Sequence, residues 1–251
     1  MSLTEEYKNQ SDWRIWDTYF DMLPISQNGT ILDLGCGVGT VTKLLAQKAK
    51  YVIAIDFNPD LIQEAKLSNS AQNIDYVISD LNNIHKLDLP KVDGIWTSFV
   101  AAYFPDFKPI LNRWLACLKA GGWIAIVEMA DLFAHTPLSQ TTQDIFNEYY
   151  IRQFKNNIYD FEMGLKLKDF VIKSGLTVIH EETKIDQELT FSGPAEPRIL
   201  KAWEDRFNRM NVFKDYLGEF DFLKIKKEFM ECLSNKEHKS NSIVKFIVAR
   251  K

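Results

Sequence analysis

The sequence has few cysteines, no excess of basic residues and no long apolar run. Its three cysteines, Cys36, Cys117 and Cys232, are far apart and form no CxxC pair, so neither a disulfide framework nor a zinc site is expected. Lys and Arg number 30 against 34 Asp and Glu, a net charge of −4, which argues against nucleic acid as a partner. The longest apolar runs, 51–55 and 123–127, are strand-sized and far shorter than the roughly 20 residues of a membrane span.

The first ten residues, MSLTEEYKNQ, include two acidic residues and no apolar stretch, unlike a signal peptide. We therefore expect a cytoplasmic protein that does not bind membranes. The chain has 251 residues, 46% of them hydrophobic and 25% charged, which is average for a globular protein. This length suits one α/β domain with a lid, and no repeat or flexible linker divides it. We expect a single domain over residues 1–251.

Apolar segments of strand length alternate with helix-sized segments over the first 130 residues. The expected strands begin at Thr30, Tyr51, Ile74, Val92 and Trp123. Nearly continuous apolar strands separated by helices indicate a parallel sheet that is covered on both faces. Two more strands are expected at 177–185 and 242–251.

Two helical segments lie outside this alternation. Within an N-terminal segment 1–24, residues 11–23 place Trp13, Trp16 and Phe20 at helical spacing, which predicts one amphipathic helix. An insertion at 186–240 holds two amphipathic candidates and carries nearly balanced charge. We expect this insertion to form a helical lid, although a simple extension of the core would have the same pattern.

The strongest local signal is DLGCGVG, which runs from Asp33 to Gly39. It brings an acid and alternate glycines to a turn between an expected strand and an expected helix. Glycines permit a sharp turn and let a ligand approach the backbone without meeting a Cβ. The carboxyl end of a parallel strand is also where α/β sheets bind ligands. A turn selected only for its backbone geometry would show the same glycines.

Acids at the two neighbouring strand ends strengthen this interpretation. Asp56 ends the second expected strand, where a carboxylate can accept hydrogen bonds from both hydroxyls of a ribose. It could also cap the helix that begins at Pro59, a role open to Asn58 as well. Asp80 follows the third strand, where it could accept from an adenine amino group or belong to an ordinary surface turn.

Taken together, these residues resemble the pattern of class I, Rossmann-like methyltransferases, which use S-adenosylmethionine (SAM). The segment DLGCGVG is similar to the first motif of that family, whose backbone and acid hold the amino-acid portion of SAM. The SAM-binding residues that the resemblance implies are Asp33, Gly35, Cys36, Gly37, Asp56 (ribose), Phe57 (adenine), Asp80 and Leu81 (adenine edge), and Ser98 and Phe99 (methionine part).

The resemblance covers residues 25–130 well and the two terminal strands more loosely. It implies an α/β fold with a mostly parallel seven-stranded sheet, helices on both faces and an antiparallel C-terminal strand. It also implies SAM as cofactor and S-adenosyl-L-homocysteine (SAH) as product. No His/Cys cluster has ligand spacing, so no metal is expected. A nicotinamide-dependent oxidoreductase is disfavoured because Thr40 stands where GxGxxG requires Gly or Ala. A non-catalytic SAM-binding protein stays open.

The acceptor is expected to be a small molecule methylated at O, N or C, and the protein a monomer or homodimer. The fourth strand ends in Thr97-Ser98-Phe99-Val100, not in the Asn/Asp-Pro-Pro-Tyr/Phe motif used on planar amide or exocyclic amino nitrogens. A protein or RNA acceptor is the alternative. Several aromatic residues could roof the site or simply pack in the core: Tyr103, Phe104, Phe133, Tyr149, Tyr150 and Phe154.

A general base is needed only if the acceptor arrives protonated. The candidates after the fifth strand are Glu128, Asp131 and His135. His135 is our catalytic candidate because its intrinsic pKa suits proton transfer near neutrality. A histidine in a solvent-exposed loop is the alternative for His135, and a helix cap is the alternative for Asp131.

Overall fold

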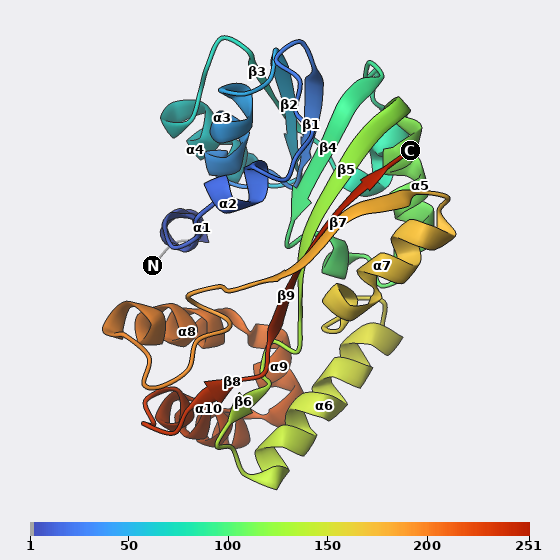
Figure 1. Cartoon of the computed structure of the whole chain (residues 1–251). Coiled ribbons are helices and arrows are strands. Elements are labelled where there is room, and N and C mark those ends of the chain that lie inside the picture. The colour runs from blue at the N-terminus through green and yellow to red at the C-terminus, as the bar shows by residue number, and fades with distance from the viewer. Residues whose placement is uncertain (1–2) are drawn as a thin grey trace.

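The computed structural model describes residues 3–251. Its centre is a seven-stranded sheet with the order β3-β2-β1-β4-β5-β9-β7, in which β9 runs antiparallel to both of its neighbours (Figure 1). The strands are β1 (Thr30–Leu34), β2 (Tyr51–Asp56), β3 (Ile74–Ile78), β4 (Val92–Ser98), β5 (Leu118–Ala130), β7 (Thr177–Lys184) and β9 (Ile243–Arg250). The predicted sheet is confirmed, including its antiparallel C-terminal strand.

Helices cover both faces because successive side chains of a strand point to opposite sides. Ile31 packs in one apolar core with α3 (Thr40–Ala46). Its neighbour Leu32 packs in a second core with α5 (Phe107–Ala116) and α7 (Met163–Lys173). This two-sided burial explains why the strands read as continuous apolar runs.

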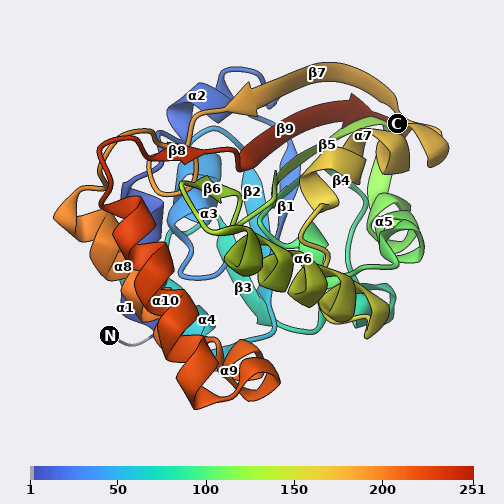
Figure 2. The same cartoon turned by 90° about the horizontal axis from the view of Figure 1, so that it is seen from below.

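A helical cap lies beyond the carboxyl ends of the parallel strands (Figures 1 and 2). It consists of α6 (Gln140–Lys155), α8 (Pro197–Arg209), α9 (Asn211–Leu217) and α10 (Glu219–Leu233), with a small ladder of β6 (His135–Thr136) and β8 (Lys239–Ser240). The two helices expected in the insertion 186–240 form as α8 and α10, and the short helix α9, which was not predicted, lies between them. Phe213 of α9 is fully buried, and this burial stabilises the short helix.

The cap has an aromatic core that extends outside the insertion. The ring of Phe133 stacks on that of Phe146 at 4.3 Å, and it lies 5.7 Å from Phe229 and 5.9 Å from Phe207. Phe133 and Phe146 belong to segments that precede residue 186. The helices of the insertion therefore share their packing with the rest of the chain.

The single N-terminal helix predicted over 11–23 is wrong. The chain forms α1 (Leu3–Asp12) and a short α2 (Asp17–Phe20), with a turn between them. Trp16 in that turn lies 6.1 Å from Trp96 of β4, and Phe20 lies 5.5 Å from it. Packing of these rings against the sheet overrides the helical spacing.

The fifth strand begins earlier than the expected Trp123, since α5 ends at Ala116 and β5 begins at Leu118. Leu118 pairs with Val92 at the start of β4, and the N–H of Val92 donates to the carbonyl of Cys117 at 2.9 Å. This pairing extends β5 through the glycines.

Within residues 3–251, no helix combines the length and the apolar character that crossing a bilayer requires.

Candidate cofactor and acceptor site

The three glycines of the turn after β1 serve two different purposes. All of them have positive φ, at 74° for Gly35, 54° for Gly37 and 79° for Gly39. A Cβ on Gly35 or Gly39 would collide with neighbouring side chains, so these glycines permit close packing. A Cβ on Gly37 would meet only the Tyr7 ring, at an ordinary 3.5 Å. Gly37 is therefore the position that keeps the backbone open to a ligand.

Asp56 joins the end of β2 to this turn. Its Oδ2 accepts a hydrogen bond from the N–H of Gly37 at 2.9 Å, and its Oδ1 accepts from the N–H of Asn58 at 2.9 Å. Burial raises the pKa of Asp56, and these backbone bonds oppose the shift. Asn58, not Asp56, caps α4 (Pro59–Ser68), because its side chain accepts from the N–H of Asp60. The capping alternative for Asp56 is wrong.

Asp33 supports the turn from inside the protein. The carboxylate is 2% exposed and accepts a hydrogen bond of 2.6 Å from the hydroxyl of Thr42. Burial raises its pKa to about 7. Burial also raises the pKa of the neighbouring Cys36 thiol. Contact of these residues with SAM stays a prediction.

The residues predicted for the adenine end lie at the ends of β2 and β3. Asp80 is exposed and caps the 3-10 helix η1 (Leu81–Lys86), accepting from the N–H of Asn82 at 2.8 Å. Asp80 thus belongs to a surface turn, which is the alternative given for it above. Its other carboxylate oxygen, Oδ2, accepts only a long hydrogen bond of 3.4 Å from the side chain of Asn83. Phe57 is 73% exposed beside Asp56, and Leu81 is buried.

Ser98 and Phe99 lie at the carboxyl end of β4, next to β1. Phe99 has a φ of 58°, which is uncommon for a residue with a side chain and concentrates at functional sites. Its N–H donates to the carbonyl of Val127 at 2.8 Å. The guanidinium of Arg14 lies over its ring at 4.4 Å. These contacts hold the backbone of Phe99 in place.

The base candidates Glu128 and Asp131 lie at and just after the end of β5. The buried Glu128 carboxylate accepts from the N–H groups of Ala102 (3.0 Å) and Met129 (2.9 Å), so it anchors the 3-10 helix η2 (Ala101–Tyr103). Burial raises its pKa to about 7. Asp131 is half-buried with a φ of 58°, and burial raises its pKa as well.

His135 is not in a solvent-exposed loop, and that alternative is wrong. It is 1% exposed because the cap packs around it, with Trp203 at 5.4 Å and Phe229 at 5.1 Å. Its Nδ1 lies 2.9 Å from Nε2 of His238. Burial and then His238 lower the pKa of His135 to about 3. The imidazole is therefore neutral at pH 7, and its catalytic role stays a prediction.

Sequence reasoning missed Tyr7, which lies next to Gly37, and two residues associated with it, Tyr159 and Arg206. Tyr7 of α1 shares a hydrogen bond with Tyr103, and the Tyr103 ring lies 4.9 Å from that of Tyr159. The charge of Arg206 acts on all of these hydroxyls. No local pattern marks Tyr7 or Tyr159. Arg206, however, follows the buried Trp203 by three positions, which places both on one face of α8.

Of the aromatic residues expected to roof the site, Tyr103 alone belongs to this group. Phe133 and Tyr149 pack in the cap core. The hydroxyl of Tyr150 accepts a hydrogen bond of 2.6 Å from the N–H of Phe133. Phe104 packs 5.9 Å from Trp114 in the second core. The Phe154 ring is 47% exposed, with the ammonium of Lys166 over it at 4.7 Å.

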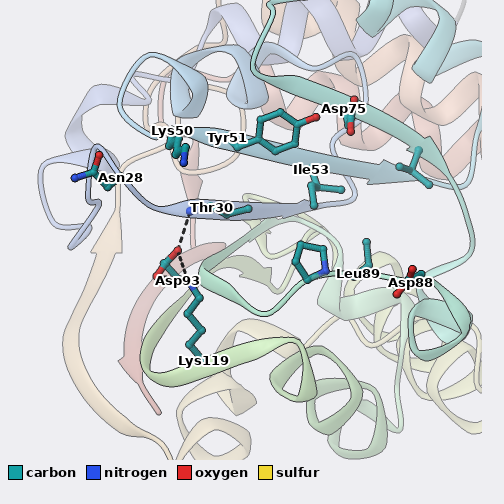
Figure 3. A pocket seen from close by; sticks show the side chains of 12 residues that line it. Asn28, Thr30, Lys50, Tyr51, Ile53, Asp75, Asp88, Leu89, Asp93 and Lys119 are labelled. Atoms are coloured by element: carbon teal, nitrogen blue, oxygen red, sulfur yellow. Dashed lines mark hydrogen bonds and ion pairs between the residues drawn. The ribbon is translucent and has the colours of Figure 1, made fainter.

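A pocket of about 680 Å³ lies elsewhere, at the amino ends of β1 to β4 (Figure 3). There Asp93 accepts from the N–H of Thr30 at 2.8 Å and pairs with Lys119 at 2.8 Å. In sheets of this kind, ligands bind outside the carboxyl ends of the strands. We therefore place the candidate site at the glycine turn, at the opposite end of the sheet.

Comparisons with known proteins identify what the chain is similar to. Residues 32–126 match the family model described as "Methyltransferase domain". The malonyl-[acyl-carrier protein] O-methyltransferase of Hamiltonella defensa is 27% identical over 124 residues, which are 49% of this chain and 46% of that protein. The match thus spans less than half the length of that relative.

Two solved structures share the fold. A SAM-dependent methyltransferase from Mesorhizobium loti has a TM-score of 0.55 at 17% identity, covering 94% of this chain and 97% of the other. The Haemonchus contortus phosphoethanolamine N-methyltransferase 2, solved with phosphomonomethylethanolamine and SAH, has a TM-score of 0.55 at 18% identity, covering 94% and 52%. Residues 32–126, which include most of the glycine turn, thus match the methyltransferase domain family, and the sheet order is that of the SAM-dependent methyltransferase fold.

Proposed function

We propose that the protein transfers a methyl group from SAM to a small-molecule acceptor at O, N or C. The observation that carries the proposal is the hydrogen bond from Gly37 to Asp56. It holds a carboxylate suited to a ribose directly against the glycine of this turn whose backbone is open to a ligand. A cytoplasmic location and a monomer or homodimer belong to the same proposal.

The residues around the turn fit SAM. The Asp56 carboxylate accepts from the backbone N–H groups of Gly37, Asn58 and Phe57, which leaves about one of its roughly four lone-pair sites for a ribose hydroxyl. The exposed ring of Phe57 offers a flat apolar face to the adenine. A Cβ at position 37 would occupy the approach to the turn.

In this proposal, the turn from Gly35 to Gly37 and the end of β4 at Ser98 and Phe99 hold the amino-acid part. Asp80 and Leu81 take the adenine edge. SAM, when bound, supplies a methyl group on a positive sulfonium that a nucleophile can displace. The protein then has to orient the acceptor and exclude water, and positioning of this kind contributes as much as about 7–11 kcal/mol to a barrier.

A small molecule is favoured as acceptor because the cap covers the same end of the sheet as the glycine turn (Figure 1). The relatives named above act on malonyl-[acyl-carrier protein] and bind phosphomonomethylethanolamine. The near balance of acidic and basic residues offers no grip on RNA. A protein or RNA acceptor is the second candidate, and a non-catalytic SAM-binding protein the third.

Incubation of the purified protein with SAM and a metabolite panel, read by mass spectrometry, tests the proposal. We expect SAH and one methylated metabolite to form in equal amounts, and unlabelled SAH to compete. Methylation confined to a protein or RNA fraction would select the second candidate. Tight SAM binding without SAH formation in metabolite, protein and RNA fractions would select the third.

A further inference from the structure

We propose that Arg206 and the hydroxyls of Tyr7, Tyr103 and Tyr159 form an acceptor subsite for an oxyanion, a carboxylate or a phosphate group. The inference rests on the proposed methyl transfer and names the chemical class of the acceptor. Its parts come from α1, from η2 after β4, from the segment after α6 and from α8. They are distant in sequence. Tyr7 lies against the glycine turn, Tyr103 and Tyr159 are linked to it by contacts, and the charge of Arg206 acts on all three hydroxyls.

The position of the three tyrosines next to the turn comes from their contacts. A Cβ on Gly37 would lie 3.5 Å from Cδ2 of Tyr7. The hydroxyls of Tyr7 and Tyr103 are hydrogen-bonded to each other. The rings of Tyr103 and Tyr159 meet edge to face, with 4.9 Å between centroids and 85° between planes. Tyr7 therefore stands between a group bound at Tyr103 and Tyr159 and the turn at Gly37, where SAM is proposed to bind.

The hydroxyls of these tyrosines serve as hydrogen-bond donors. The neighbouring Tyr103 and burial raise the pKa of Tyr7, and burial is the main cause that raises the pKa of Tyr103 and of Tyr159. All three keep their protons at neutral pH. Tyr103 is nevertheless 57% exposed. A small ligand can therefore reach it.

Arg206 supplies the positive charge and a free donor. Its guanidinium lies over the Trp203 ring at 4.8 Å, and its Nη2 donates to Glu188. Its Nε is buried and has no hydrogen-bond partner among the described residues. A buried donor of a charged group is costly when it stays unpaired. A carboxylate or phosphate matches the planar guanidinium better than other groups do.

Charges of both signs surround the cluster, and Arg206 supplies its cationic side. Asp56 and Glu128 act on the tyrosine hydroxyls together with Arg206. Asp56 lies on the cofactor side, and Glu128 is engaged by the backbone of η2. A cationic acceptor group would face the charge of Arg206. An anionic group would be attracted there, which leaves the nucleophilic end of the acceptor toward the glycine turn.

A purely structural role, in which Arg206 only docks α8 onto Glu188, is the alternative. Glu188 has further partners, since its Oε2 lies 3.4 Å from Nη2 of Arg14 and its Oε1 accepts from Gln10 at 3.4 Å. Arg206 is therefore not the sole neutralising partner of that buried carboxylate. The two roles differ in what substitution does to anion binding.

Binding of simple oxyanions to the full chain saturated with SAH tests the subsite. The probes are acetate and inorganic phosphate, each against chloride at equal ionic strength, with the thermal unfolding midpoint as readout. We expect one of them to raise the midpoint, and which one does so separates a carboxylate from a phosphate acceptor. Arg206→Met should weaken that binding at least about tenfold, as loss of a charged hydrogen bond predicts, and Arg206→Lys should restore part of it.

Arg209→Met is the matched control, because Arg209 lies on the same helix and pairs with Glu6. It should keep oxyanion binding. The double substitution Tyr103→Phe with Tyr159→Phe retains both rings and removes two donors, so it should weaken oxyanion binding even if Arg206→Met fails to fold. No effect of either oxyanion, or equal effects on the wild type and on a folded Arg206 or tyrosine variant, would overturn the subsite. Failure to bind SAH at all would instead count against the proposed function.

Discussion

The Oδ2 atom of Asp56 accepts a hydrogen bond of 2.9 Å from the backbone N–H of Gly37. This bond connects the end of β2 to the turn that follows β1, two adjacent strands of the sheet. It fixes the position of a carboxylate before any ligand arrives, and such preorganisation is favourable for binding.

Replacement of Asp56 by Ala should weaken SAH binding by about 1.5–3 kcal/mol, because hydrogen bonds to a charged group are lost. Calorimetry on the folded variant measures the change. Asp93→Ala is the matched control, since Asp93 accepts from a backbone N–H at the opposite end of the sheet (Figure 3). Equal SAH affinity in the Asp56 variant and the wild type would contradict the assignment.

Two glycines of the turn should respond differently to substitution. Gly37→Val places a branched side chain where only Tyr7 is near, so it should abolish SAH binding while the protein still folds, with some strain from the φ of 54°. Gly39→Ala would collide with Tyr76 and Ala65, so its main effect should be a lower free energy of unfolding. Circular dichroism and SAH titration of both variants separate the effects. A folded Gly37→Val protein with unchanged SAH affinity would refute this placement.

Acid should destabilise the cap through His135. Its pKa is lowered from an ordinary 6.5 to about 3, so below pH 6.5 the unfolded chain holds a proton that the folded chain lacks. Stability from this group is therefore present above pH 6.5 and falls as the pH drops, by up to about 1.4 kcal/mol per pH unit. His135→Phe should remove that dependence. Denaturant unfolding at pH 7 and pH 5 measures the free energy of unfolding of both proteins. If the variant and the wild type differ by the same amount at both pH values, this account of His135 is wrong.

The same variant tests the predicted catalytic role of His135. The imidazole of His135 is neutral at pH 7, and its Nδ1 is hydrogen-bonded to His238. A folded His135→Phe protein that has lost turnover but retains SAH affinity would support His135 as the general base. Turnover within a fewfold of wild type would end that assignment.

The cap should depend on its aromatic core. Phe213→Ala removes a fully buried ring of α9, which typically costs about 3–5 kcal/mol. Phe220→Ala, at an 83% exposed position in α10, is the control and should change the free energy of unfolding by less than about 0.5 kcal/mol. Chemical denaturation measures both. Equal stability of the two variants would contradict the packing described for α9.

Much of the sheet could be predicted because strands buried on both faces have a continuous apolar pattern. The run at Tyr51–Asp56 and the glycine turn beside it are local signals, and the resemblance placed Asp56, Ser98 and Phe99 at the ends of the two strands that flank β1. Local signals did not separate α1 from α2, because the break depends on Trp16 packing against Trp96 in a distant strand.

The acceptor side was least predictable for the same reason. Tyr7 and Tyr159 meet through Tyr103 only once α1 and the segment after α6 have folded against η2. His135 follows β5 in sequence, where a loop was a fair expectation, yet its partner His238 is 103 residues away. Contacts of such separation leave no periodicity in the sequence.

The most direct test of the central claim is calorimetric titration of the purified protein with SAM, SAH, NAD and NADP. The account predicts saturable binding of SAM and SAH at one site per chain, weakened by Asp56→Ala, and no binding of either nicotinamide dinucleotide. Binding of NAD or NADP with none of SAM would contradict it.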